Sequence, residues 1–304
     1  MIHTTAAKWA RLVGAILLTG TLLYLAMRGV AFDEAWQVMR RMRWLYMGAA
    51  IVLTLISPFV RAWRWQELYD CDAPGFWLLF RAIVTGQTLN LAVPFRTGEV
   101  ARVLIAGGRK LDAAGTVALE KLLDAGFFAA LCLLLPLVWV IPNWLQKPRE
   151  SVIVMAAAFA VVILSVFIVP RISRFPRILR MPPITRIPIL AITTVFLGMS
   201  GVAVNDLVLR SLAIQTPFIA AVVLLVILQA GVAVPSTPGK LGVFQYLAFL
   251  GLSLFGVGRA PAIAFGLLLH LLVFLPPAAM AALFLGCGKA KPEDASQRQS
   301  TTLG

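Results

Sequence analysis

Residues Gly86–Gly107, GQTLNLAVPFRTGEVARVLIAG, set how the rest of the chain is interpreted. Residues Leu228–Leu250, LQAGVAVPSTPGKLGVFQYLAFL, repeat their pattern without a gap. The offset of 141 residues pairs Pro94 with Pro235 and Gly98 with Gly239. The chain therefore carries one local pattern twice, once in each half.

In both copies an apolar run is interrupted at a proline, continues through short polar residues and a glycine, and then resumes. Proline removes a backbone donor and glycine adopts dihedral angles closed to other residues, so each copy predicts two half-helices joined by an irregular turn. Broken helices at matching positions of two halves are typical of a transporter binding site. The predicted helix-break residues are Pro94, Gly98, Pro235, Pro238 and Gly239.

The composition of the chain indicates a membrane protein. Of 304 residues, 60% are hydrophobic and 13% are charged, and a soluble domain cannot bury that much apolar surface. In a soluble protein the net charge of +14 would indicate nucleic acid. Here most basic residues lie between apolar runs, where cytoplasmic flanks and anionic lipid headgroups account for them. We expect membrane-lipid partners and no nucleic acid.

The apolar runs predict an all-α polytopic membrane protein with about six full spans and two broken, re-entrant hairpins. A first membrane repeat, residues 1–145, contains spans at about 10–27, 44–60 and 113–141 and a hairpin at 76–106. A second repeat, residues 146–288, contains spans at about 152–169, 187–209 and 262–285 and a hairpin at 218–255. Residues 289–304 form a polar tail that we expect to be disordered.

The topology of the two halves is predicted to be opposite, because each half has an odd number of spans. This is the inverted-repeat plan of secondary transporters, with hairpins that enter from opposite sides and meet near the midplane. The segment Arg171–Arg186 is rich in arginine and contains no acidic residue, so we place it and both termini in the cytoplasm. The cluster Arg40–Arg43 argues against this orientation. The expected location is the inner (plasma) membrane.

Ionisable residues in apolar runs are costly and are expected to face the protein interior or a cavity. Glu99 and Lys240 occupy equivalent repeat positions with opposite charge. They predict either a gate that opens for a lipid headgroup or a static ion pair between the hairpins. Arg96 and Arg102 either hold phosphate or extend toward the interface.

Three further charged residues follow the first hairpin. Glu120 and Asp124 share a helix face at i,i+4 spacing, and Lys121 lies beside them. They form either a polar wall along the path of the lipid or a group whose charges neutralise one another.

Polar residues near the breaks also have two interpretations. Asn90, Ser236 and Thr237 either bind a headgroup, or cap half-helices whose backbone groups lack partners, or both. His270 lies in an apolar run and is interpreted as a packed, hydrogen-bonded residue. The predicted substrate-binding set is Asn90, Arg96, Glu99, Arg102, Glu120, Lys121, Asp124, Ser236, Thr237 and Lys240. We predict an interfacial anchor at Arg61, Arg64 and Trp65, since arginine and tryptophan together suit a helix end at the headgroup level.

Sequence motifs for catalysis or metal binding are not apparent. The chain shows no zinc-protease helix, nucleophile elbow, Walker loop or cysteine pair motif, and its three scattered cysteines are interpreted as small apolar residues. We therefore expect no enzymatic activity, no cofactor and no metal.

Several motifs resemble the membrane domain of the lysylphosphatidylglycerol synthase/flippase family over about residues 10–287. They are Arg61-Ala62-Trp63-Arg64-Trp65, Gly98-Glu99-Val100-Ala101-Arg102, Ala118-Leu119-Glu120-Lys121 with Asp124, and Pro235-Ser236-Thr237-Pro238-Gly239. The resemblance implies the lipid-translocating domain without the soluble aminoacyl-transferase domain. It implies a lipid cargo that is anionic, aminoacylated, hopanoid or polyprenyl-linked.

Two other functions are compatible with the sequence. The first is a non-transporting membrane scaffold for enzymes of envelope lipid or glycan synthesis, which would dock through Arg171–Arg186 and the tail. The second is an integral-membrane glycosyl- or acyl-lipid transferase, which would require an activated donor.

Overall fold

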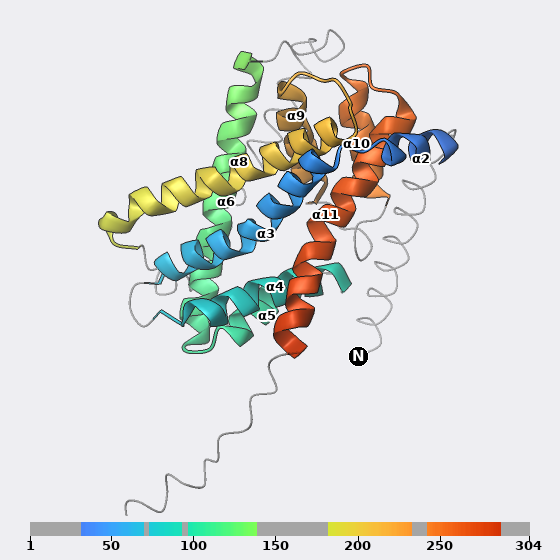
Figure 1. Cartoon of the computed structure of the whole chain (residues 1–304). Helices are drawn as coiled ribbons and strands as arrows, with labels where there is room; N and C mark the ends of the chain where they lie inside the picture. The colour runs from blue at the N-terminus through green and yellow to red at the C-terminus, as the bar shows by residue number, and fades with distance from the viewer. Residues whose placement is uncertain (1–31, 70–72, 93–96, 139–181, 233–241, 287–304) are drawn as a thin grey trace, which may run out of the picture.

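The computed structural model describes residues 32–69, 73–92, 97–138, 182–232 and 242–286. All secondary structure in these ranges is helical (Figure 1), which confirms the predicted all-α class. The predicted spans 10–27 and 152–169 and the tail 289–304 lie outside the described residues. The elements are α2 (Phe32–Arg40), α3 (Trp44–Glu67), α4 (Phe76–Ala92), α5 (Thr97–Ile105), α6 (Lys110–Val138), the 3-10 turn η2 (Ile184–Arg186), α8 (Ile187–Ser211), α9 (Ile219–Val232), α10 (Val243–Ser253) and α11 (Arg259–Gly286).

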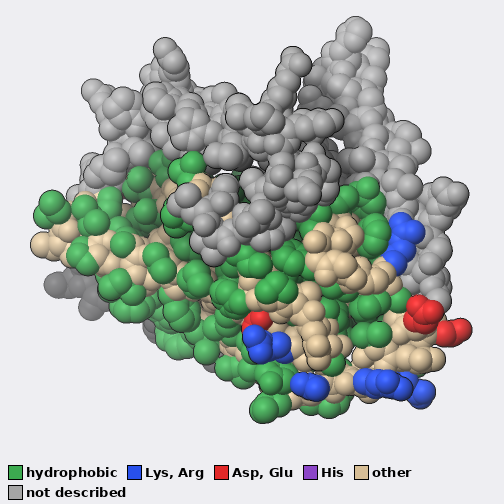
Figure 2. All heavy atoms as spheres, turned by 90° about the horizontal axis from the view of Figure 1, so that it is seen from above, with side chains coloured by type: hydrophobic (Ala, Val, Ile, Leu, Met, Phe, Trp, Pro, Cys, Tyr) green, Lys and Arg blue, Asp and Glu red, His purple; other side chains and the backbone are tan. Residues whose placement is uncertain are grey.

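Three described helices have the length and apolar composition needed to cross a membrane: Trp44–Glu67, Ile184–Ser211 and Arg259–Phe284. They correspond to the predicted spans 44–60, 187–209 and 262–285. Large apolar side chains on them remain outside the protein core, such as Leu45 and Leu283. Figure 2 shows hydrophobic side chains over most of the described surface on one face of the molecule, as lipid contact requires.

Helices α3 and α8 pack against each other in antiparallel orientation. At one end, the backbone N–H of Arg43 donates a hydrogen bond to the carbonyl of Ser211 over 2.7 Å. At the other end, Arg186 Nη1 donates to the carbonyl oxygens of Glu67 and Tyr69. The pair, drawn in blue and yellow in Figure 1, runs through the centre of the described structure.

A helix lies on each side of both predicted breaks. Helices α4 and α5 flank the first break and α9 and α10 flank the second, and the two members of each pair pack against each other. Figure 1 shows the first pair at the bottom of the view and the second pair at the top. Of the helix-break residues, only Gly98 is described. Pro94, Pro235, Pro238 and Gly239 lie outside the described residues.

The contact between α4 and α5 depends on two glycines. A Cβ atom added at Gly98 would overlap the carbonyl oxygen of Gly86, and one added at Gly86 would lie 2.6 Å from Cγ of Arg102. Asn90, near the end of α4, accepts a hydrogen bond from the backbone N–H of Gly98 over 2.8 Å. This bond satisfies one of the free N–H groups in the first turn of α5, as the capping interpretation of Asn90 predicts.

Two buried apolar clusters form the core. One lies mainly between α8, α9, α10 and α11 and includes Leu209, Leu224 and Phe265. The other lies between the C-terminal part of α3 and helices α4 to α6, and includes Trp65 and Phe80. Each broken helix pair therefore contributes to a core of its own.

Gly98→Ala tests the close approach of α4 and α5. The added methyl group would force the helices apart, and we expect a loss of about 1–3 kcal/mol of unfolding free energy, typical of overpacking. Gly48→Ala in α3 is the matched control, because an added Cβ there meets no atom within 4 Å. Alanine favours a helix interior, so this control should be neutral or stabilising. Thermal unfolding of both variants in detergent is the measurement, and equal effects would contradict the packing argument.

Candidate functional site

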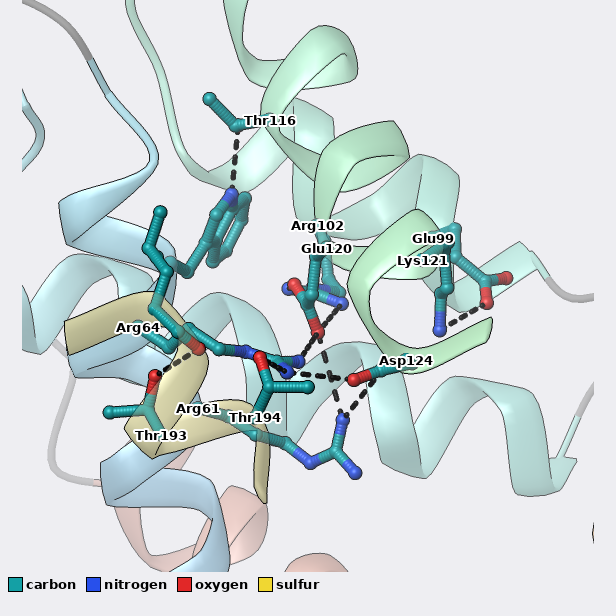
Figure 3. A network of polar contacts seen from close by, with 12 residues as sticks. Arg61, Arg64, Glu99, Arg102, Thr116, Glu120, Lys121, Asp124, Thr193 and Thr194 are labelled. Atoms are coloured by element: carbon teal, nitrogen blue, oxygen red, sulfur yellow. Dashed lines mark hydrogen bonds and ion pairs between the residues drawn. The ribbon is translucent and has the colours of Figure 1, made fainter. Parts of the chain in front are cut away.

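A network of charged side chains joins three helices beside the first broken pair (Figure 3). Arg61 and Arg64 come from α3, one turn apart, and Arg102 comes from α5. Glu120 and Asp124 come from α6. Their i,i+4 spacing places both carboxylates on the face of α6 that meets the arginines, as the sequence predicts.

Glu120 is the centre of this network. Its side chain has no solvent exposure, and Arg102 binds both carboxylate oxygens through its two terminal nitrogens. Arg64 Nη2 and Arg61 Nη1 lie 3.5 and 3.7 Å from Glu120 Oε1. A carboxylate that is shielded from water must be neutralised by such partners, since burying an unpaired charge is very costly.

Asp124 extends the network toward the surface. Arg64 Nη1 lies 2.8 Å from Asp124 Oδ1, and Arg61 Nη1 lies 3.6 Å from Asp124 Oδ2. The side chain of Asp124 is 33% exposed and that of Arg61 is 29% exposed. The network therefore reaches from a fully buried carboxylate to groups that are accessible from outside.

Lys121 pairs with Glu99 of α5 rather than with its neighbours on α6. Lys121 Nζ lies 3.4 Å from Glu99 Oε1. The two carboxylates are paired mainly with arginines of α3 and α5, which the interpretation that Glu120, Lys121 and Asp124 neutralise one another did not include. The proposed partner of Glu99 in the second hairpin, Lys240, lies outside the described residues, so that pairing stays a prediction.

The interpretation of Arg64 and Trp65 as an interfacial anchor is also wrong. Both side chains are completely buried. Arg64 Nη1 donates to Thr194 Oγ1 of α8 over 3.2 Å, and Trp65 Nε1 donates to Thr116 Oγ1 of α6 over 2.9 Å. They face the carboxylates of α6 and the core instead of the headgroups, and only Arg61 keeps partial exposure.

Arg102 does not extend toward the interface. It is 7% exposed, and its guanidinium carbon lies 4.3 Å from the centre of the Trp65 ring. The cation–π contact and the Glu120 ion pair hold it in the interior. The partner predicted to share its phosphate-binding role, Arg96, lies outside the described residues, as do Ser236 and Thr237.

His270 is packed, as predicted, but its Nδ1 atom has no hydrogen-bond partner in the described part of the chain. Its ring lies 4.4 Å from that of Phe274 and 5.5 Å from that of Phe244. Aromatic contacts therefore replace the expected hydrogen bond at this atom. No group of three or more possible metal ligands occurs among the described residues.

Thr116 and Thr194 are site residues that the sequence analysis did not single out. Each is a buried threonine in a largely apolar helix, and each accepts a hydrogen bond from α3. Threonine is common at such positions, and its hydroxyl can equally bond to its own helix. Thr193 bonds to its own helix in this way, and Thr116 does so as well, since its hydroxyl donates to the carbonyl of Ala113 over 2.9 Å. No feature of the sequence shows that Thr116 and Thr194 also accept hydrogen bonds from α3.

A family model described as the lysylphosphatidylglycerol synthase TM region matches residues 12–281. The chain belongs to this family. The resemblance noted from the sequence motifs is thereby confirmed, and the lysylphosphatidylglycerol synthase TM family marks the chain as a membrane domain related to lipid handling. Searches of curated proteins and of solved structures found no match.

Glu120→Gln tests whether this family member depends on its buried carboxylate. The variant keeps the shape of the side chain but leaves Arg64 and Arg102 with too little negative charge, and breaking a buried ion pair in this way costs about 3–5 kcal/mol. The control is Asp206→Asn, which removes the i,i+4 partner of the half-exposed Arg210 and should change stability little, because exposed ion pairs are screened by water. Thermal unfolding in detergent measures both. A loss for Glu120→Gln no larger than the control would contradict a structural dependence on the network.

Proposed function

We propose that the protein is a lipid translocator that moves a polar-headgroup lipid across the inner membrane. The observation that carries this proposal is the ionic network beside the first helix break. Helix α5 begins directly after the break and carries both Glu99 and Arg102. The headgroup would enter this polar region while its acyl chains stay in the bilayer.

The energetic cost of the network supports a functional role. Charged groups inside a membrane protein are expensive, and those that are retained commonly mark a substrate path. Well-packed apolar side chains of similar volume would often be neutral or more stabilising than a buried ion pair. In a membrane domain of a lipid-handling family, five charged residues that lie together suit a site for a polar headgroup.

The graded exposure of the network and of the adjacent Lys121–Glu99 pair supports a route for the headgroup. Lys121 is 48% exposed and its partner Glu99 is 25% exposed. Arg61 and Asp124 are accessible to a similar degree, whereas Glu120 is fully buried. A headgroup can exchange with these ion pairs in sequence, so that no charge loses all its partners at once.

The order of the helices supports an inverted repeat. Shifted by the 141-residue offset, α3 falls on η2 and α8, α4 falls on α9, and α5 and α6 overlap α10 and α11 in part. The offset also relates the two ends of the α3–α8 pair. Adding 141 to residue 43 and subtracting 141 from residue 211 gives residues 184 and 70, so the Arg43–Ser211 contact has its equivalent next to the observed contact between Arg186 and Tyr69. The antiparallel α3–α8 pair is where two inverted halves would meet, and rocking about it would alternate access.

The remaining parts of the proposal concern mechanism and orientation. The chain moves the lipid without catalysing a chemical reaction. The two hairpins re-enter the membrane, one from each side. The N- and C-termini face the cytoplasm, where basic segments are retained.

A fluorescence-quench assay in proteoliposomes tests the translocation. It uses tail-labelled lipids with anionic, zwitterionic, aminoacylated and polyprenyl-linked headgroups, and we expect at least one class to move between leaflets without ATP. Glu99→Gln should slow this movement by about tenfold, the effect of losing one charge-assisted hydrogen bond in the rate-limiting state. Arg109→Gln is the matched control, because Arg109 is 75% exposed and its ion pair joins it to Asp112, outside the network. If the folded native protein moves none of these lipids, the proposal is overturned.

A further inference from the structure

The ionic network carries an excess of positive charge. Every other ion pair of the described residues joins one base with one acid, as in Lys121–Glu99 and Arg109–Asp112. In the network, three arginines share two carboxylates. The arginines are Arg61, Arg64 and Arg102, and the carboxylates are Glu120 and Asp124. Among the described residues, one positive charge of the network is therefore without a counterion.

The same arginines have donors that no acceptor uses. Nε and Nη2 of Arg64 and Nε of Arg102 are buried and make no hydrogen bond within the described part of the chain, although Arg64 Nη2 lies 3.5 Å from Glu120 Oε1. A guanidinium has five N–H donors and cannot lose its charge in a protein. Buried donors without acceptors are costly, so charge and hydrogen bonding independently favour an additional anion with several oxygen atoms.

The network has one edge at which such an anion can enter. Arg61 and Asp124 are partly exposed, whereas Arg64 and Glu120 have no exposed side-chain surface. An anion that displaces the Asp124 carboxylate gains the terminal nitrogens of Arg61 and Arg64, while Glu120 keeps its two bonds to Arg102. Phosphate oxygens match the planar guanidinium fork.

We propose that this site selects lipids whose phosphate headgroup carries a net negative charge over lipids whose phosphate is balanced by amines. The proposal rests on the proposed function and names its substrate class. One negative charge brings the network to neutrality, whereas a zwitterionic headgroup leaves the excess in place and a cationic headgroup increases it. These differences matter because charges interact strongly where water is excluded.

Equilibrium binding to the purified full chain in a neutral detergent tests the selectivity without transport. The probes are tail-labelled phosphatidylglycerol, a polyprenyl monophosphate, phosphatidylethanolamine and lysylphosphatidylglycerol, with inorganic phosphate as competitor. We expect the two anionic lipids to bind about tenfold more tightly or better, the scale of one hydrogen bond to a charged group. Displacement by inorganic phosphate would identify phosphate itself as the recognised group, and its failure would restrict the site to intact lipid.

Two variants change the charge of the network in opposite directions. Arg61→Gln removes the excess charge and should weaken the binding of phosphatidylglycerol by about tenfold while changing that of phosphatidylethanolamine little. Asp124→Asn increases the excess positive charge of the network and should strengthen the binding of phosphatidylglycerol. Arg109→Gln, an exposed arginine outside the network, is the matched control and should change neither.

Equal binding of all four lipids by the native chain would overturn the inference, and this comparison needs no variant to fold. Weaker phosphatidylglycerol binding by Asp124→Asn, at an unchanged melting temperature, would also overturn it, since a purely structural network predicts that result. Anionic preference in binding with no movement in the quench assay would overturn the proposed function and leave the inference intact. Movement of lipids together with equal binding of all four lipids would overturn the inference and leave the proposed function intact.

Discussion

The neutralisation of Glu120 is the constraint on which this half of the molecule depends. A fully buried carboxylate requires cations from its neighbours, and it receives them from α3 and α5 rather than from its own helix. Three helices are thereby fixed relative to one another by charge as well as by packing. The requirement also explains why α3 continues as a helix through Arg64 to Glu67, beyond the end of its most apolar part.

The close helix contact at the first break serves the same constraint. Gly86 lies where any larger residue would meet the side chain of Arg102, and Gly98 allows the backbones of α4 and α5 to approach. Arg102 then passes between α4 and the Trp65 ring to reach Glu120. The small residues of the repeated pattern thus make room for a buried arginine.

The antiparallel α3–α8 pair connects this site to the other half of the chain. Arg64 contacts both Asp124 of α6 and Thr194 of α8, so the network is joined directly to the central helix pair. A rigid central pair with an ionic site on one side suits a protein whose halves move relative to each other around a bound headgroup.

The sequence by itself determined the all-helical membrane class, the three described spans, the helices on either side of each break, the shared face of Glu120 and Asp124, and the family. These follow from hydropathy, from the backbone restrictions of proline and glycine, and from helical periodicity, all of which are local. Only the tertiary structure decided that Arg64 and Trp65 are buried and that Glu99 pairs with Lys121. An arginine beside a tryptophan at a helix end has the same composition whether it meets lipid headgroups or a buried carboxylate, and which of the two it meets depends on a helix more than 50 residues away in the chain.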